Sequence, residues 1–567
     1  MKKFSHKYIC FYLLLFFLFP LLSYSAPVEP THPVYDYLQR IAIKFDLPAF
    51  YLNTRPLQKQ DIQGALKAIE SVSVELNQWE REKFHYYRRE FFTTSRKEIS
   101  KLIYQKDERE LIGSSSFHLM FFSQDSLPVS QQYGLAHLQL NIEGKLFSQL
   151  GFVSSVTFAQ ERALEAQYAE HYQAWRGLPY NTPEKADSKK DHYSLETYDA
   201  FRMVLCYQKE QYTLEVGNDW NQWGPGIWQH PSFAQNSWAW VQDSLEVKNA
   251  FESEQNFNPD STRYYHHAQA RRGYRSPGER APLVMVRGTA NWEFLKYSKF
   301  IGQRTGLSYD HSSHITGHRL EVGWKNFSVG VYEMLVFSRE NMEWTYALPF
   351  VSLFIAEHMT GDRDNVAMGL DMQIILWNKL RLYAELFLDD MVSPLSLFED
   401  YWGNKSAISV GGELIDPFVD NTVLQFEYAR VEPWVYSHHV YDNQFQQLGN
   451  TMGSLLPPNA HMVNIRWRLD LLPGYFVSAA YRFYQHQHLD KGSSLFDVHE
   501  LDDPETKNFL GQGPETRHDI TTRFGYHWSH YIKTSCLTGY QYTDNWRSAE
   551  GMSLEGMLLG AEVQLRY

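Results

Sequence analysis

A tryptophan-rich segment contains the residues whose types and spacing most directly suggest chemistry. Five of the 16 tryptophans lie within 21 residues: Trp220, Trp223, Trp228, Trp238 and Trp240. Asn, Asp and Gln side chains flank them, beginning with Asp219. An exposed indole ring can stack on the C–H face of a sugar while amides and carboxylates bond the sugar hydroxyls. The segment therefore suggests carbohydrate binding, although the same tryptophans could pack a loop or form the aromatic girdle of a membrane protein.

A cluster of basic residues follows the tryptophans. Arg271 and Arg272 begin a group of four arginines that ends at Arg280. On an acidic chain this patch could hold an anionic polymer or the phosphates of lipopolysaccharide, or it could be a solvated loop. The histidine pairs at 266–267 and 438–439 could suggest a metal, but adjacent strand residues point to opposite sides and no third ligand is indicated. We therefore predict no metal site and no cofactor.

No arrangement of residues supports catalysis. The sequence lacks the G-x-S-x-G, H-E-x-x-H and phosphate-loop motifs of common enzyme classes. Neighbouring acids occur at 389–390 and 502–503, but on an extended chain their side chains diverge and do not form an acid/base pair. We therefore predict that the protein is not an enzyme.

The N-terminus predicts export. Three lysines precede the apolar run 8–22, and small residues suit cleavage after Ser25, so residues 1–25 are expected to be a signal peptide. Its three lysines leave 50 of the 53 basic residues against 66 acidic ones, a net charge of −16. Nucleic acid is excluded as a partner because its binding relies on clustered Lys and Arg that neutralise phosphates.

The composition favours a large β-rich protein with a small helical region. The 567 residues are 16% aromatic, yet the mean hydropathy is polar at −0.45. Beyond the first two dozen residues, no apolar run approaches the roughly 18 residues of a spanning helix. A helical period runs from Val34 to Leu111, with Leu38 and Ile41 on its apolar side. Residues 26–112 are therefore expected to form a periplasmic α-helical bundle.

From about residue 114 apolar and polar residues alternate, as in β-strands with one apolar face. The range 463–470 alternates over eight residues without a fault. Such segments are about 10 to 13 residues long, which suits a tilted transmembrane strand, and short turns alternate with long excursions. Residues 113–567 are therefore predicted to form an outer-membrane β-barrel of about 18 antiparallel strands with long extracellular loops. The cell would be of the Gram-negative type.

The last residues of the chain also suit a barrel. Alternate positions are apolar: Met557, Leu559, Ala561, Val563 and Leu565. The chain ends on the aromatic Tyr567, as many outer-membrane barrels do. We expect the barrel-assembly machinery to act on this strand, outer-membrane lipid including lipopolysaccharide to surround the barrel, and the protein to be a monomer.

Several short motifs resemble the capsule-assembly outer-membrane proteins of the Wzi family. Residues 33–40 and 54–57 resemble the family's helical start, and residues 223–226 its W-G-P-G loop. Further similar motifs occur in the second half of the chain: Gly330 to Glu333, Tyr383 to Asp390, and Glu427 to Pro433 with Tyr436. The likeness follows the mature chain in order, although the stretch 251–281 looks like an insertion.

The resemblance implies an 18-stranded barrel with a periplasmic helical bundle. It also implies a lectin-like protein that retains or organises exported capsular polysaccharide, with Glu333, Asp389, Asp390 and Tyr436 among its ligand residues. Glu333 falls on the apolar side of its strand, so either a bulge re-aims it or it sits at the outer rim. The alternative function is a porin or transport channel, because 18 strands can enclose an aqueous lumen.

Overall fold

The computed structural model describes most of the chain. The described residues are 26–92, 101–106, 109–127, 129–147, 149–164, 181–184, 193–234, 282–304, 313–339, 341–390, 399–447, 450–471, 474–527 and 532–566. The predicted signal peptide lies outside these ranges, and so do four candidate site residues: Trp238, Trp240, Arg271 and Arg272. Within the described ranges, no helix is long and apolar enough to span a membrane.

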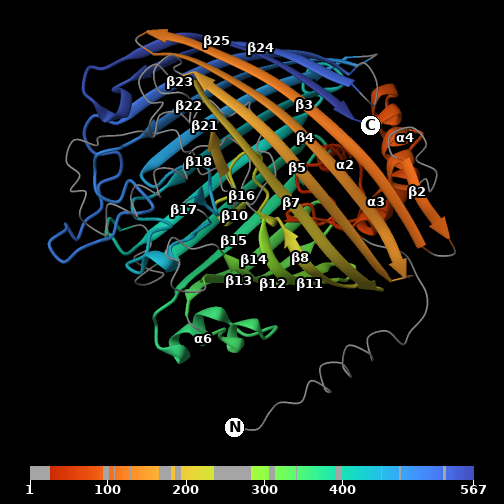
Figure 1. The fold of residues 1–567 in the computed structure, drawn as a ribbon, viewed down its shortest axis with the longest axis horizontal. Helices are drawn as coiled ribbons and strands as arrows, with labels where there is room; N and C mark the ends of the chain where they lie inside the picture. Colours follow the sequence, from red (N-terminus) through yellow and green to blue (C-terminus); the bar gives the residue numbers. More distant parts are fainter. Residues whose placement is uncertain are drawn as a thin grey trace.

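A closed antiparallel β-barrel of 18 strands forms the body of the protein, as the sequence predicts (Figure 1). The strands are β3 (Arg109–Leu127), β4 (Val129–Phe147), β5 (Leu150–Leu164), β7 (Tyr193–Lys209), β8 (Tyr212–Asp219), β11 (Leu283–Asn291), β12 (Leu295–Arg304), β13 (Ser313–Gly323), β14 (Phe327–Ser338), β15 (Asn365–Leu376), β16 (Leu380–Asp390), β17 (Lys405–Ile415), β18 (Thr422–Val431), β21 (Ala460–Asp470), β22 (Tyr475–His486), β23 (Glu515–His527), β24 (Ile532–Asp544) and β25 (Leu554–Arg566). Pairing of β25 with β3 closes the ring. Two short strands, β2 (Lys101–Lys106) and β6 (Asn181–Glu184), pair with β3 and β7.

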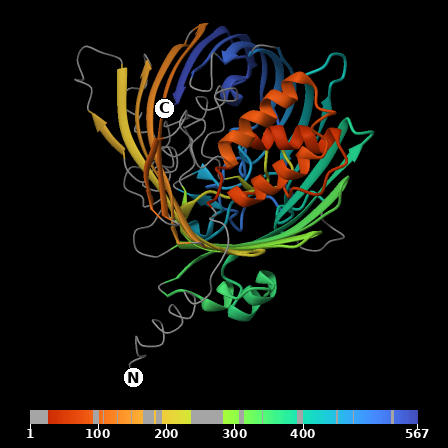
Figure 2. The same ribbon diagram turned by 90° about the vertical axis from the view of Figure 1, so that its right-hand side faces the viewer.

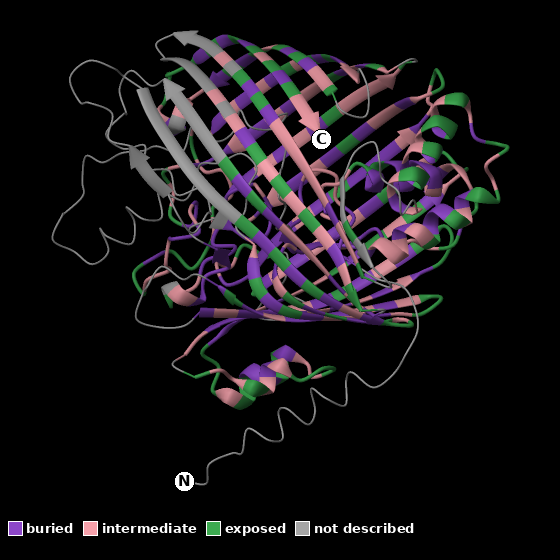
Figure 3. Cartoon of the chain, turned by 45° about the vertical axis from the view of Figure 1, so that its right-hand side comes forward, coloured by how far each residue is buried: buried purple, intermediate pink, exposed green. Residues whose placement is uncertain are grey.

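Apolar side chains cover the outside of the barrel. On β4, Leu138, Leu140 and Ile142 are exposed, whereas His137 is buried. The alternation of buried and exposed residues repeats along the strands in Figure 3. Successive strand residues face opposite sides, so the barrel presents an apolar surface to lipid and a polar surface to its interior. Closure of the ring also pairs the backbone groups that hydrocarbon could not satisfy.

Short turns with exposed aromatic side chains lie at one rim of the barrel, here called the periplasmic rim because short turns face the periplasm in outer-membrane barrels. Trp292 and Phe294 lie in the β11–β12 turn, Trp324 in the β13–β14 turn and Trp377 in the β15–β16 turn, and all four are exposed. Trp377 and Asn378 adopt positive φ angles of 54° and 53°, which lets two residues reverse the chain. Aromatic side chains at this level suit the boundary between hydrocarbon and water.

Three amphipathic helices lie within the ring of strands at this rim (Figure 2). They are α2 (Val34–Lys44), α3 (Lys59–Glu70) and α4 (Gln78–Phe92), and their apolar faces share one core that includes Leu38, Ile62 and Phe84. Strands of the barrel sheet begin at Lys101, so the barrel starts earlier than the expected boundary at 112–113. Pairing of β3 with β2 and β4 draws residues 109–112 into the sheet, which a local periodicity does not reveal.

Buried ion pairs fix the helices to the barrel. The Arg40 guanidinium donates to Glu80 of α4 at 2.9 Å and to Asp416 of the β17–β18 turn at 2.6 Å. The Lys44 ammonium bonds the same two carboxylates at 2.7 and 2.9 Å. Ile43 of α2 also contacts Ile415 at the end of β17. Helix α2 therefore joins the helical region to the rim through both charge and apolar contact.

Removal of Arg40 is expected to loosen the helices. Arg40→Ala leaves the fully buried Glu80 carboxylate with one cation in place of two, and breaking a buried ion pair costs about 3–5 kcal/mol. Limited proteolysis should then cut within residues 26–92 at a protease concentration that leaves the unchanged protein intact. Arg88→Ala is the matched control, because the Arg88–Glu70 pair is about half exposed on both sides and contributes little. Equal proteolysis of the two variants would contradict this role of Arg40.

Candidate functional site

The tryptophan-rich segment enters the barrel. Strand β9 (Gln222–Trp223) pairs with β1 (Thr54–Arg55), next to the helical region, and with β10 (Phe233–Ala234), so these three strands form a small sheet. Trp223 is completely buried. The expectation of an exposed sugar-stacking indole is therefore wrong for Trp223, because this large apolar ring fills space inside the barrel.

Carboxylates on the barrel wall bind the backbone of this segment, which we call the tryptophan loop (residues 220–234). Glu427 of β18 accepts hydrogen bonds from the amides of Ile227 at 2.8 Å, Trp228 at 3.2 Å and Gln229 at 2.8 Å. Glu385 of β16 accepts from the Ser232 amide at 3.0 Å. Four amides of the loop therefore donate to two inward carboxyl groups, which determine the path of the loop.

Glycine is required where the loop passes Glu385. Gly224 has φ +94°, which side-chain-bearing residues rarely adopt, and a Cβ there would come within 2.1 Å of a Glu385 carboxylate oxygen. Its amide donates to the Asn53 carbonyl at 2.9 Å. The next residue, Pro225, accepts from the Arg381 guanidinium of β16. The W-G-P-G motif thus encodes a close approach between loop, helical region and barrel wall.

The excursion between β18 and β21 also contacts the tryptophan loop. Asp389 accepts from the Tyr436 amide at 2.7 Å, and the Tyr436 hydroxyl donates to the Pro231 carbonyl at 2.9 Å while accepting from the Ser454 amide at 2.9 Å. Asp389 and Tyr436 are both buried. The structure therefore gives these two candidate ligand residues a scaffold role, in which Asp389 orders one loop and Tyr436 joins it to the next.

A hydrophobic core forms where these excursions meet the inner wall. Its aromatic members are Trp223, Phe233, Phe300, Tyr332, Phe387, Tyr436, Phe445, Tyr484 and Phe496. The Trp223 ring lies 5.5 Å from that of Phe300 and 5.8 Å from that of Phe233. The interior beside β11 to β18 is consequently closely packed, with this apolar core lying among the polar groups of the inner wall.

Asp219 and Trp220 lie where β8 ends. The buried Asp219 carboxylate accepts from Arg202 at 2.7 Å and from Arg287 at 2.6 Å. Arg287 also donates to the Trp220 carbonyl at 3.0 Å, and Arg202 lies over the Trp220 ring at 5.6 Å. Two guanidinium groups already neutralise Asp219, so its observed role is to hold neighbouring strands together. Trp220 is only partly buried and keeps part of its surface available.

Trp228 is the member of the tryptophan loop that borders open space. A small, partly open cavity lies beside it. Four adjacent strands, β21 to β24, supply the rest of the lining, with charged side chains at Arg466, Arg482, Asp519 and Arg523. The Arg466 guanidinium stands 5.2 Å from the centre of the Trp228 ring, and Arg482 donates to Asp519 at 3.0 Å. Arg523 is paired in turn with Glu562 at 2.9 Å, so Arg466 is the cation beside the indole that best suits an anionic sugar.

Glu333 and Asp390 lie away from this cavity. Glu333 pairs in regular register with His318 and Met368, so no bulge re-aims it, and its side chain faces outward. There it accepts from the Ser352 hydroxyl at 2.9 Å and the Leu353 amide at 2.6 Å, with His318 at 3.0 Å. Asp390 is exposed at the outer end of β16, 3.8 Å from Lys405. The structure therefore does not bring these two candidates together with Trp228.

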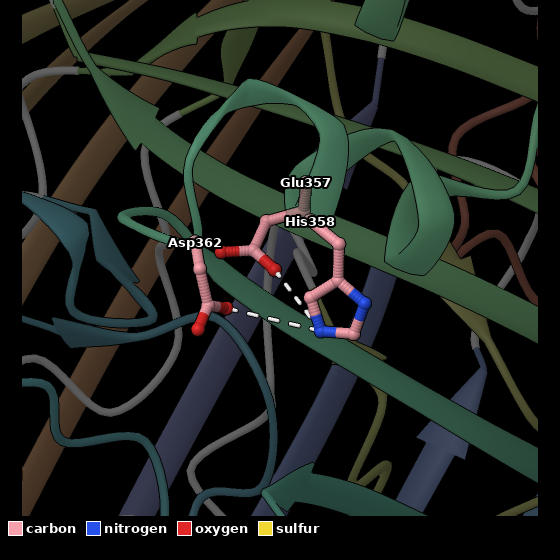
Figure 4. A group of neighbouring side chains, drawn as sticks. All are labelled: Glu357, His358 and Asp362. Carbon is pink, nitrogen blue, oxygen red and sulfur yellow. Dashed lines mark ion pairs between the residues drawn. The ribbon is translucent and has the colours of Figure 1, made fainter.

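One group among the described residues could hold a metal ion (Figure 4). It comprises Glu357, His358 and Asp362, with His358 Nε2 lying 4.0 Å from Glu357 and 3.8 Å from Asp362. Burial, and then the charge of Asp362, raises the pKa of Glu357 to about 7. A proton can therefore neutralise this carboxyl near neutral pH, and His358 can pair with the acids when charged. Two of the three residues are exposed, so we do not assign a metal here.

Comparison with known proteins was informative at the level of structure. No protein-family model matches the chain, and no curated protein is significantly similar in sequence. The solved structure of Wzi from Escherichia coli aligns with a TM-score of 0.55, covering 95% of this chain and 99% of that one, at 12% identity. The fold is that of Wzi. The resemblance inferred from short motifs is thus confirmed for the fold.

Wzi is described as a carbohydrate-binding β-barrel of the outer membrane that is involved in group 1 capsule assembly. Two Pseudomonas aeruginosa structures are also similar. OccK2 in complex with glucuronate has a TM-score of 0.40, 10% identity and coverage of 80% of this chain and 98% of that one. OpdK has a TM-score of 0.41, 9% identity and coverage of 81% and 99%. These two scores are too low to bear on function, whereas the Wzi match supports an outer-membrane barrel.

Sequence reasoning missed the basic side of the cavity. Arg466 was visible on the polar side of an alternating strand, and Arg482, Asp519 and Arg523 occupy equivalent polar positions on later strands. The sequence signal for this side of the cavity was therefore an arginine or an acid on the inward face of three successive strands. Strand register decides which of these residues come together. The contact with Trp228 depends on the path of a loop that lies more than 200 residues earlier in the sequence.

Proposed function

We propose that the protein binds an exported anionic polysaccharide and anchors or organises it at the cell surface. The observation that carries the proposal is the cavity in which the Trp228 indole faces guanidinium groups. The indole offers a stacking face for a sugar ring, and Arg466 and Arg482 offer donors for a uronate carboxylate. The carbohydrate binding described for Wzi supports the same class of ligand.

The proposal also includes export, membrane insertion and the other candidate ligand residues. Residues 1–25 direct export and are cleaved, and the barrel-assembly machinery inserts the chain through its C-terminal strand. The barrel works as a monomer in contact with lipopolysaccharide. Trp238, Trp240, Arg271 and Arg272 extend the binding surface beyond the described residues, and Asp219, Asp389 and Tyr436 support it from within.

The porin alternative has less support from the geometry. A pore requires a continuous polar path, whereas a buried apolar cluster fills the interior beside β11 to β18. The α2–α4 helices also lie within the ring at the periplasmic rim (Figure 2). The proposal of catalysis has no support in the arrangement of the described side chains, since the carboxylates nearest Trp228 bind backbone amides or arginines.

The Trp228→Ala variant tests the proposed function. Binding of the purified protein to uronate-containing and neutral bacterial polysaccharides would be measured by isothermal titration calorimetry. We expect binding to the uronate polymers that weakens with salt, and about tenfold weaker binding for Trp228→Ala, which corresponds to about 1.4 kcal/mol. Arg466→Gln should weaken binding to uronate polymers while leaving any binding to neutral polymers unchanged.

Trp292→Ala is the matched control, because Trp292 has an exposed indole at the periplasmic rim, away from the cavity. Equal affinities for Trp228→Ala and Trp292→Ala would reject the cavity as the binding site. In a capsulated host, deletion of the gene should release capsule from the cells, and capsule retained at normal levels would argue against the anchoring role.

A further inference from the structure

The excursion between β14 and β15 folds back against the outside of the barrel wall. It comprises residues 341–364, here called the α6 segment, with a 3-10 helix (Trp344–Ala347) and helix α6 (Leu353–Thr360). Figures 1 and 2 both place α6 outside the ring of strands, beside β11 to β14. The Tyr346 carbonyl accepts from the outward-facing Thr316 hydroxyl of β13 at 3.2 Å. The segment therefore covers a part of the barrel surface that would otherwise face lipid.

The inner face of the α6 segment is a small core. Tyr346, Leu353 and Ala356 are buried against Leu335 and Phe337, which point outward from β14. At the outer rim, Asp364 accepts from the Tyr346 hydroxyl at 2.7 Å and from the Arg339 guanidinium at 2.5 Å, which fixes the two ends of the excursion together. These contacts hold the α6 segment in a defined position against the barrel wall.

The α6 segment covers charged groups on the outward face of the barrel. Glu333 lies under the start of α6 and bonds Ser352, Leu353 and His318. Lys299 of β12 faces outward in the same area, within electrostatic reach of Glu333, and is largely buried. Charges on the lipid face of a barrel are strongly unfavourable near the bilayer midplane. These three titratable groups can occupy this face because the segment shields them.

Strand geometry places this patch at the level of the hydrocarbon. Glu333 lies six positions along β14 from Phe327, next to the periplasmic turn that carries Trp324. Six residues span about 20 Å along a strand, which is about 15 Å of height at the usual tilt of about 45°. The apolar band of such barrels is about 25 Å tall. Glu333 and the start of α6 therefore lie within the band, in its outer half.

The other face of the α6 segment is apolar and exposed. Its members are Trp344 (72% exposed), Leu348 (52%), Phe350 (76%), Phe354 (39%), Ile355 (59%) and Met359 (80%). The exposed polar residues His358, Asp362 and Arg363 come together at the end that returns to the outer rim. Val331, the outward residue of β14 that precedes Glu333, and its cross-strand partner Leu370 are also apolar and exposed, so the apolar face of the segment adjoins the lipid-facing surface of the barrel.

We propose that the α6 segment is embedded in the outer leaflet, where acyl chains of an outer-leaflet lipid cover its exposed apolar face. The occupant is lipid because this face continues the established lipid-facing surface of the barrel at hydrocarbon depth. Aromatic and aliphatic side chains supply the contact area, as in interfacial amphipathic helices. The segment has two consequences: it fixes the barrel in the leaflet, and it shields Glu333, His318 and Lys299 from hydrocarbon.

Spin labels at Ile355 and Met359 test the proposal. Ile355→Cys and Met359→Cys would be made separately in a chain in which Cys206 and Cys536 are replaced by alanine, labelled with a nitroxide, and reconstituted in vesicles of phosphatidylcholine and phosphatidylglycerol. Collision with oxygen reports hydrocarbon, and collision with a water-soluble nickel complex reports water. Leu370→Cys on β15 is the hydrocarbon reference, and Leu501→Cys in the β22–β23 excursion is the aqueous reference, since Leu501 is fully exposed.

We expect both labels to match Leu370→Cys, with an oxygen-to-nickel collision ratio several-fold above that of Leu501→Cys. A ratio equal to that of Leu501→Cys would place α6 in water and overturn the proposal. Immobilised labels that neither reagent reaches would also overturn it, because that result means that a second copy or another protein covers the face. Two labelling positions keep the test valid if one variant does not fold, as judged by the heat-induced mobility shift of a closed barrel.

Discussion

Glu427→Ala is expected to free the tryptophan loop from the barrel wall and to weaken polysaccharide binding at least as strongly as Trp228→Ala. The Glu427 carboxylate accepts from the amides of Ile227, Trp228 and Gln229 and from the Tyr383 hydroxyl at 2.6 Å. Alanine leaves these buried donors without their acceptor, at a cost of about 1–3 kcal/mol for each unsatisfied group. The expected loss of stability is therefore several kcal/mol, visible as a lower midpoint in thermal unfolding of the detergent-solubilised barrel.

Glu413→Ala is the matched control for Glu427→Ala. Glu413 is also a buried inward carboxylate, on the neighbouring strand β17, but its observed partner is the Gln425 side chain rather than the tryptophan loop. Glu413→Ala should lower the unfolding midpoint less than Glu427→Ala does, because it removes the acceptor of one side-chain donor rather than that of three loop amides and a hydroxyl. Glu427→Gln retains one acceptor oxygen and should fall between the two. Unchanged binding in Glu427→Ala would mean that the loop does not depend on this carboxylate to present Trp228.

The barrel could be predicted from the sequence because each strand carries its own signal. Along β21, Val463 and Ile465 point to lipid while Asn464 and Arg466 point inward, so two different solvents select two kinds of side chain in strict alternation. Strand length matches the thickness of the bilayer, and the alternation of short turns with long excursions indicates the topology of the barrel. None of these signals requires knowledge of a distant residue.

The interior of the barrel could not be predicted in the same way. Trp223 and Trp228 lie five residues apart in one polar segment, and local sequence does not distinguish the buried indole from the one beside the cavity. The difference arises from Glu385 and Glu427, which lie more than 150 residues away and bind the intervening backbone. These acids were recognisable as parts of motifs, yet their role as acceptors for a loop depends on which inner wall the loop meets.

Glu333 shows how an apparent exception to a pattern can mark a tertiary contact. On alternation alone it is an acid on the lipid face, which suggested a bulge or a position at the rim. The regular pairing with His318 and Met368 rules out a bulge at this position, and the α6 segment supplies the cover that the alternation could not foresee. A departure from strand alternation is therefore useful evidence that another part of the chain packs there.

Trp223→Ala is expected to destabilise the barrel interior by about 3–5 kcal/mol, the usual range for removing a fully buried large side chain. The Trp223 ring contacts Phe233, Phe300 and Tyr332, so the cavity left by alanine would lie at the meeting point of loop and wall. Thermal unfolding should show the loss. Trp324→Ala, at the exposed periplasmic turn, is the control and should change the unfolding midpoint little.

The pair of Trp223→Ala and Trp228→Ala separates the two roles that tryptophan can have in this segment. If Trp223 is a packing residue, its removal lowers stability first, and Trp223→Phe recovers most of the loss because a phenyl ring refills part of the cavity. If it were a sugar-stacking residue, Trp223→Ala would weaken binding at unchanged stability, the pattern that we expect for Trp228→Ala. Opposite effects of the two substitutions on stability and affinity would show that the tryptophan loop is a buried anchor that carries one ligand-facing indole.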